Sequence, residues 1–163
     1  MTAPRSLLTA HRLRPHRQLG QNFLSQPSVA EMIVARAGVS PEEVVLEIGA
    51  GLGALTIPLA RVARGVTAIE RDRNLVPLLR AELLAAGIQN VTIIEADALA
   101  LNLAELARAA GRPLTVFGNL PYNISSQIVI KLIESRRQIL RAVLMFQKEL
   151  AQRLSASASL LWS

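Results

Sequence analysis

The sequence has no cysteine, and its 163 residues include only two histidines, His11 and His16. A chain without cysteine has no disulfide framework, no thiolate metal site and no thiol nucleophile. Zinc sites and Ser-His-Asp triads need histidines, and both histidines here lie in a basic stretch at the start of the chain. We therefore expect neither a metal centre nor catalysis by cysteine or histidine.

Long hydrophobic runs are also lacking. An arginine, glutamate or aspartate interrupts every apolar stretch before it reaches the ~18 residues that a membrane-spanning helix needs. The start of the chain has no apolar segment of the kind found in secretory signals. Hydrophobic residues still make up 51% of the sequence, and the mean hydropathy is +0.34, which excludes a disordered chain. The length predicts one domain with a substantial core, and we expect no association with a membrane.

Acidic residues are outnumbered by basic ones, 12 against 18, which gives a net charge of +6. The excess favours a polyanionic partner such as a nucleic acid; the alternative is that it reflects genome composition and solubility. Residues 1–19 are expected to be a flexible basic leader that contacts phosphate or is merely solvated. An organellar transit peptide is the alternative for this leader; otherwise we expect a cytoplasmic location. No acid precedes Glu31, and the leader's arginines are Arg5, Arg12, Arg14 and Arg17.

Short apolar runs alternate with helical patterns along the rest of the chain. This alternation predicts βαβ units and an α/β fold with a mostly parallel, doubly wound, Rossmann-like sheet. Strands are expected at 44–48, 65–70, 91–95, 114–118 and 141–146. Helices are expected from Pro27 to Gly38, after Gly53, and at 72–87, 102–110, 127–135 and 147–154, with Ser125 or Ser126 capping the helix at 127.

Two of these helices have a defined apolar face. The helix from Pro27 is expected to place Val29, Met32, Ile33 and Ala37 on one face. The helix after Gly53 is expected to carry Leu55, Leu59 and Val62.

A glycine-rich turn follows the first strand. The buried run at 44–48 leads directly into Gly49, Gly51 and Gly53, which allow a sharp turn and a close approach of the backbone to a ligand. The helix that follows points free N–H groups at the same place, which suits a nucleotide-like cofactor. A tight strand-to-helix turn without a ligand is the alternative, because a glycine fingerprint alone is a weak motif.

Polar residues stand at the carboxyl ends of four strands, where a parallel sheet binds its ligands. Glu70 can accept both hydroxyls of a ribose, or it caps the next helix. Asp97 can accept from an adenine amino group, or it is a turn residue. Glu47 assists electrostatically or satisfies donors of the turn. Asn119, next to Pro121 and Tyr122, can hold a planar amine, although Tyr122 alone could be a core ring.

Together these stretches resemble the successive motifs of the ribosomal RNA adenine dimethyltransferases. The resemblance covers about residues 17–154. With leucine at position 120, the motif at 119–125 resembles the branch of the family that acts on small-subunit (16S) RNA. The matching motifs are 20–24 (Gly-Gln-Asn-Phe-Leu), 47–53 (Glu-Ile-Gly-Ala-Gly-Leu-Gly), Ile69 with Glu70, Asp97, and 119–125 (Asn-Leu-Pro-Tyr-Asn-Ile-Ser).

The resemblance implies S-adenosyl-L-methionine as the cofactor. Residues from the N-terminal loop would close over it, the glycine turn would approach its methionine portion, and the acids would bind ribose and adenine. The cofactor-binding residues implied in this way are Asn22, Leu24, Gly49, Gly51, Glu70, Asp97 and Asn119.

The resemblance also implies the reaction and its catalytic residues. Asn119 would lie between cofactor and target, with Leu120 and Tyr122 completing the target pocket. The product would be two adjacent adenosines near the 3′ end of 16S RNA, each dimethylated on its exocyclic nitrogen, in a precursor of the small ribosomal subunit. An aromatic amine meeting a sulfonium methyl needs positioning rather than a strong base. We expect a monomer.

The family continues beyond the fifth strand with a hairpin and a small RNA-gripping helical domain. We expect residues 20–154 to be a methyltransferase domain that is incomplete at its C-terminal end, and 155–163 to be a non-family tail of a truncated product or fragment. Two other functions compete. A nicotinamide-dependent oxidoreductase would also use the glycines and Glu70 but leaves Asn119 unexplained. A non-catalytic RNA- or partner-binding protein on the same fold is the other.

Overall fold

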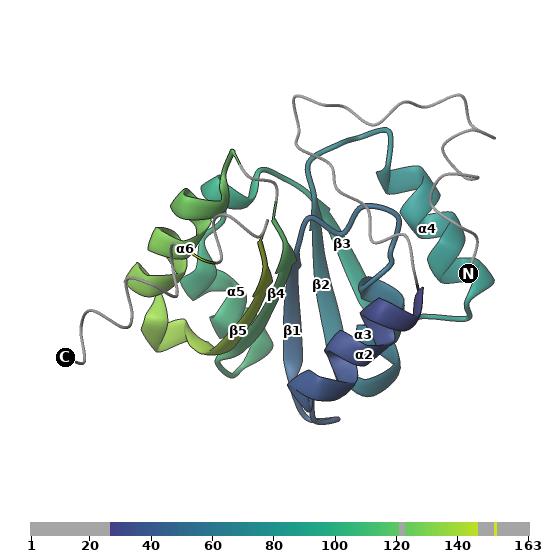
Figure 1. Ribbon diagram of the computed structural model, residues 1–163, viewed down its shortest axis with the longest axis horizontal. Helices are drawn as coiled ribbons and strands as arrows, with labels where there is room; N and C mark the ends of the chain where they lie inside the picture. Colours follow the sequence, from purple (N-terminus) through teal and green to yellow (C-terminus); the bar gives the residue numbers. More distant parts are fainter. Residues whose placement is uncertain (1–26, 121–122, 147–151, 153–163) are drawn as a thin grey trace.

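A five-stranded parallel sheet lies between two layers of helices (Figure 1). The computed structural model describes residues 27–120, 123–146 and 152. The strand order is β3-β2-β1-β4-β5, and all four pairings are parallel. The strands are β1 (Val44–Ile48), β2 (Gly65–Glu70), β3 (Val91–Glu95), β4 (Leu114–Asn119) and β5 (Ile139–Met145).

The helices follow the strands in alternation, as βαβ units require. They are α2 (Pro27–Ala37), α3 (Thr56–Val62), α4 (Val76–Ala85), α5 (Leu103–Ala110) and α6 (Ser125–Glu134), with short 3₁₀ segments η2 (Ala98–Ala100) and η3 (Arg136–Gln138). No helix within the described residues is long and apolar enough to cross a membrane.

Successive residues of β1 enter two different hydrophobic clusters, because side chains alternate across a strand. Val45 packs with residues of α2, α3 and α4, and Leu46 packs with residues of α5 and α6 on the other face. Figure 1 shows these two helical layers on opposite sides of the sheet. The α/β, doubly wound, Rossmann-like fold expected from the sequence is confirmed.

The strand order reverses at β1, which pairs with β2 on one side and with β4 on the other. The chain first builds outward from β1 to β3 and then crosses over to β4. In open α/β sheets a ligand crevice forms at such a switch point, beyond the carboxyl ends of the strands. The fold therefore places the glycine turn after β1 beside Asn119, the last residue of β4.

Several element boundaries differ from the sequence expectation. α6 begins at Ser125 instead of residue 127; Ile124 is its N-cap, without a side-chain cap bond, and Ser125 is buried. Neither serine is therefore the cap. β5 begins at Ile139, two residues earlier than expected. α4 is shorter than expected because the Asp72 side chain accepts from the backbone N–H of Asn74 (2.9 Å) and forms a turn first.

The expected apolar faces of α2 and α3 are partly wrong. Met32 is 45% exposed, and the buried residues of α2 are Ala30 and Val34. Met32 falls outside the arc that Ala30 and Val34 define on a 3.6-residue helix, so its hydrophobicity misled the assignment. Val62, at the end of α3, is also exposed. The expected leader at 1–19, the tail at 155–163 and most of the helix at 147–154 lie outside the described residues.

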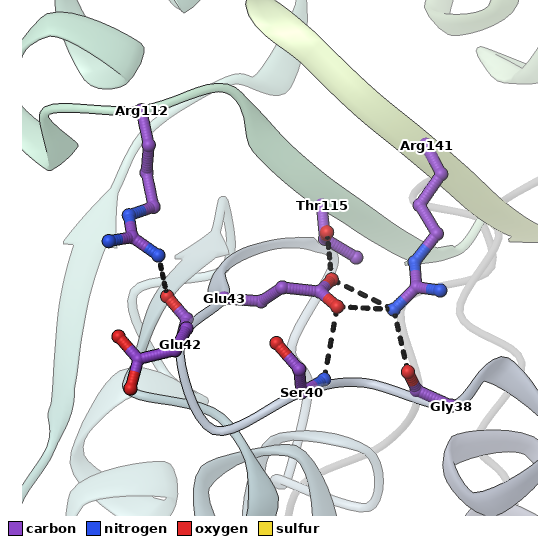
Figure 2. Close-up of polar contacts among 7 residues, drawn as sticks. All are labelled: Gly38, Ser40, Glu42, Glu43, Arg112, Thr115 and Arg141. Atoms are coloured by element: carbon purple, nitrogen blue, oxygen red, sulfur yellow. Dashed lines mark hydrogen bonds and ion pairs between the residues drawn. The ribbon is translucent and has the colours of Figure 1, made fainter.

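A polar cluster joins three segments at the amino-terminal end of the strands (Figure 2). The Glu43 carboxylate accepts hydrogen bonds from the Ser40 backbone N–H (3.0 Å), from the Thr115 hydroxyl and from Nη2 of Arg141 (2.7 and 2.8 Å). The same Arg141 nitrogen donates to the Gly38 carbonyl (3.1 Å). The cluster thus ties the loop after α2 to β4 and β5.

A register shift in β5 puts Arg141 into this cluster. Leu114 pairs with Ile139, but Thr115 pairs with Arg141, so Leu140 is an extra residue that bulges from the ladder and is exposed. Burial raises the pKa of Glu43, but the hydrogen bonds from Thr115, Ser40 and Arg141 together outweigh it and hold the pKa below its usual value. The carboxylate is therefore ionised at neutral pH.

We predict that Arg141→Met lowers the free energy of unfolding by about 1–3 kcal/mol at pH 7, because hydrogen bonds to a charged group are lost. A carboxyl whose pKa is lowered by folding adds stability above its unfolded pKa and loses it as the pH falls through the folded pKa. The difference between wild type and variant should therefore shrink below about pH 4. Urea unfolding at pH 3.5, 5 and 7 measures it, with Arg108→Met at an exposed position of α5 as the matched control. A difference independent of pH would contradict the ionic account.

Candidate active site

The glycine turn after β1 is fixed by the end of β2. The backbone N–H groups of Gly49 and Ala50 both donate to the Ile69 carbonyl, at 2.9 and 3.0 Å. Gly49 and Gly51 have φ angles of 79° and 57°, a region that side chains with a Cβ rarely adopt. The turn is therefore a preformed loop at the sheet edge.

The third glycine serves packing. A Cβ on Gly53 would lie 2.9 Å from Cδ1 of Leu79, so a larger residue would displace this buried side chain of α4, and the φ of 86° also favours glycine. The first glycine instead faces the switch point, since a Cβ on Gly49 would lie 3.7 Å from the backbone oxygen of Asn119. The structure thus brings Gly49 next to Asn119 and holds Gly51 of the same turn on Glu70; the sequence predicted all four as site residues.

Glu70 ends β2 and holds the glycine turn with its side chain. Oε2 accepts the backbone N–H of Gly51 (2.7 Å), and Oε1 accepts that of Asp72 (2.8 Å). Burial raises the pKa of Glu70, hydrogen bonds from the backbone of Asp72, Gly51 and Arg71 oppose this, and the charge of Asp72 adds to it. Each carboxylate oxygen has more than one lone pair, so both can accept a further hydrogen bond, for example from a hydroxyl.

Glu47 is a completely buried acid at the end of β1, with 1% of its surface exposed. Within the described residues, Oε2 of Glu47 and the hydroxyl of Thr56, at the start of α3, have no hydrogen-bond partner. Burial raises the pKa of Glu47 to about 8, the charge of Glu70 adds to the rise, and the nearby Thr56 hydroxyl, although outside hydrogen-bond geometry, opposes it in part. The group is thus mostly neutral at pH 7 beneath the glycine turn, where a bound cation would favour its ionised form.

Asp97 follows β3 and caps η2. Its Oδ1 accepts the backbone N–H of Leu99 (2.9 Å), and its Oδ2 lies 3.3 Å from Nη1 of Arg71. Lys131 of α6 donates to the Leu99 carbonyl (2.8 Å) and so anchors the same short segment. The predicted adenine acceptor is therefore held from two sides at the edge of the sheet.

Leu120 does not present its side chain to the site. It is 3% exposed and packs in the hydrophobic cluster formed by β4, α5 and α6, while its N–H donates to the Met145 carbonyl (3.2 Å). Any contact of Leu120 with a target would have to come from its backbone. Three further predicted site residues, Asn22, Leu24 and Tyr122, lie outside the described residues, so their roles stay predictions.

Three residues in or next to the site escaped the sequence reasoning: Thr56, Arg71 and Lys131. The sequence does hold a signal for Thr56. It is a hydroxyl residue three positions after Gly53, the last glycine of the turn, where the next helix begins. Nothing in the sequence connects Arg71 with Asp97, or Lys131 with Leu99. Within the described residues, no group of three His, Cys, Asp or Glu side chains could hold a metal ion.

Comparison with known proteins decides the family. The sequence profile of the family described as ribosomal RNA adenine dimethylase matches residues 12–162. The chain belongs to this family.

Individual relatives agree with the assignment. The Ribosomal RNA small subunit methyltransferase A of Desulforapulum autotrophicum is 53% identical over 96% of this chain, and that of Geobacter sulfurreducens is 47% identical over 88%. Those alignments cover 55% and 52% of the relatives, so the chain spans about half the length of the curated relatives it matches.

Two solved structures of similar proteins share the fold. A dimethyladenosine transferase from Plasmodium falciparum aligns with a TM-score of 0.69 and 34% identity, over 81% of this chain and 46% of that one. The 23S rRNA methyltransferase ErmE aligns with a TM-score of 0.68 and 33% identity, over 80% and 50%. The described residues of this family member thus form the sheet that carries the glycine turn, together with the helices that cover it.

We predict that Glu47→Gln changes the pH dependence of stability. A carboxyl whose pKa rises on folding, here from 4.5 to about 8, contributes stability that is complete below its unfolded pKa and is lost as the pH rises through the folded value. The stability of the wild type relative to the variant should therefore fall by about 1.4 kcal/mol per pH unit within this window. Urea unfolding at pH 5.5, 6.5 and 7.5 measures it. Glu95→Gln, at the exposed end of β3, is the control, and parallel curves for wild type and Glu47→Gln would refute the assignment.

Proposed function

We propose that this chain binds S-adenosyl-L-methionine and belongs to the catalytic machinery that dimethylates exocyclic amino groups of adenosines in 16S ribosomal RNA. The single observation that carries the proposal is the meeting of Gly49 and Asn119 at the switch point of the sheet. We infer that the substrates are two adjacent adenosines near the 3′ end of the RNA, in a cytoplasmic precursor of the small ribosomal subunit. The names of the small-subunit relatives support this choice of RNA.

The described residues fit a cationic nucleoside cofactor. Oε2 of Glu47 is a buried acceptor with no partner among them, and such an atom needs a compensating donor or cation. The carboxylate oxygens of Glu70 can each accept one more hydrogen bond, from the two hydroxyls of a ribose. Asp97 follows the neighbouring strand β3, where we place the adenine. The glycine turn lies directly beside Asn119, whose backbone oxygen would be 3.7 Å from a Cβ on Gly49.

In this proposal the chain promotes methyl transfer by orienting the target amine relative to the cofactor. When bound, the cofactor supplies an electrophilic methyl group on its sulfonium. The side-chain oxygen of Asn119 accepts an N–H of the target amine, and a neighbouring backbone carbonyl accepts the second. Both acceptors align the nitrogen lone pair with the methyl group and favour a pyramidal nitrogen, so that no strong base is required.

We expect calorimetric titration of the purified chain to show saturable binding of S-adenosyl-L-methionine and no binding of NAD. Glu70→Gln should weaken binding of the cofactor at least about tenfold, because an acceptor of the ribose hydroxyls is replaced in part by a donor. Glu95→Gln is the matched control, since Glu95 pairs with Glu70 in the sheet but is exposed. A folded wild-type chain that binds NAD or neither ligand would overturn the proposal.

Asn119→Ala separates catalysis from simple RNA binding. We expect methyl transfer to 16S RNA particles to fall about a hundredfold or more, because the target amine loses an orienting acceptor. Affinity for the RNA should change little. Filter binding and transfer of a radioactive methyl group measure the two effects. Equal effects on both, or none on either, would favour a non-catalytic RNA-binding protein.

A further inference from the structure

Arginines stand directly in front of three strands, at the opposite edge of the sheet from the candidate site. They are Arg64 before β2, Arg112 two residues before β4, and Arg136 and Arg137 in η3, before β5. We call these arginines the basic edge. Because β2, β1, β4 and β5 are successive neighbours in the sheet, with ~4.8 Å between strands, the basic edge spans ~15 Å.

The charges of the basic edge are not cancelled by ion pairs. Arg64, Arg136 and Arg137 are exposed, and none of them forms an ion pair within the described residues. Arg112 donates to the backbone carbonyl of Glu42 and not to its carboxylate (Figure 2). Its hydrogen bond therefore fixes the guanidinium without neutralising it.

The acids in the segments that lead into the five strands do not balance these arginines. These segments are 38–43, 63–64, 86–90, 111–113 and 135–138. Their acids are Glu42 and Glu43, and Glu43 is already paired with Arg141 (2.7 Å). Glu134, in the last turn of α6, stands just outside them. The amino-terminal edge of the sheet is therefore positive, whereas the carboxyl edge carries the acids of the candidate site.

The basic edge is too far from Asn119 to touch the target nucleotides. Arg112 stands just before β4 and Asn119 ends it, and a strand of six residues spans ~20 Å. An RNA segment bound at the basic edge is thus separate from the adenosines that we assign to Asn119.

We propose that the basic edge binds the phosphate backbone of a second RNA segment in the ribosomal particle, at the end of the sheet opposite the methylation site. This inference rests on the proposed function and adds a docking surface to it. Arginine contacts with phosphates supply affinity and fix orientation without reading the base sequence. Such an anchor favours the folded particle over a short RNA, because only the particle presents both segments.

The salt dependence of binding measures the phosphate contacts directly. We expect the double variant Arg136→Gln, Arg137→Gln to bind 16S RNA particles about tenfold or more weakly than the wild type at low salt, with the slope of log affinity against log salt reduced by about two. Filter binding between about 50 and 200 mM salt measures both quantities. The affinities for a short RNA hairpin that carries the two adjacent adenosines and for S-adenosyl-L-methionine should stay unchanged.

Two further double variants complete the design. Arg61→Gln with Arg80→Gln removes the same charge from exposed positions on α3 and α4, and should leave both the affinity for the particle and the salt slope unchanged. Arg136→Lys with Arg137→Lys keeps the charges and should keep the slope, since an ammonium also binds phosphate as a point charge. Thermal unfolding of each variant checks the fold, because cations near helix ends also complement helix dipoles.

Any of four results would overturn the inference. They are an unchanged slope in the glutamine variant at Arg136 and Arg137, an equal loss in the control at Arg61 and Arg80, an equal loss for the short hairpin, or a lysine variant as weak as the glutamine one. A wild-type chain that binds S-adenosyl-L-methionine but no particle would also overturn it and leave the cofactor assignment standing. A folded chain that fails to bind the cofactor would instead overturn the proposed function.

Discussion

The site depends on the attachment of the glycine turn to the end of β2. Gly49 and Ala50 donate to the Ile69 carbonyl, and Gly51 donates to the Glu70 carboxylate. A turn with glycines at positive φ gains no rigidity from its own residues, since glycine has the largest conformational freedom to lose. Three hydrogen bonds to a buried strand supply that rigidity. The same carboxylate then fixes the loop that carries Arg71, so that one acid orders both sides of the proposed cofactor site.

Acids at the two ends of the sheet have pKa values shifted in opposite directions. At the amino-terminal end, Glu43 is surrounded by donors and an arginine, and its pKa is lowered despite burial. At the carboxyl end, burial raises the pKa of both Glu47 and Glu70, and Glu47 has an oxygen without a described partner. A satisfied ion pair stabilises the fold, whereas an unsatisfied acid costs free energy unless a ligand compensates it. This contrast is what distinguishes a structural cluster from a candidate binding site, and perturbed titrating groups often mark such sites.

Local patterns predicted the parts of the fold that local physics determines. The β-branched run at 44–48 and the glycines after it specify a buried strand and its turn, and both were found where expected. Long-range pairings could not be foreseen. Glu43 and Arg141 stand 98 positions apart, and a one-residue bulge in β5 decides that they meet. The burial of Leu120 and the reach of Arg71 to Asp97 likewise depend on how neighbouring strands end, which a single sequence does not encode in any local pattern.

In the function we propose, the strands on the two sides of the switch point recognise different chemical groups. On one side of the switch point, β1, β2 and β3 end in or lead to acids, which suit a cationic cofactor that also carries hydroxyl and amino donors. On the other side, β4 ends in a neutral amide, which suits an uncharged aromatic amine. A cationic group at position 119 could not accept a hydrogen bond from the target amine and would repel the positive charge that develops on it. The amide of Asn119 offers an accepting oxygen and carries no charge, so it suits the neutral amine, whereas Glu70 suits hydroxyl donors of a cationic cofactor.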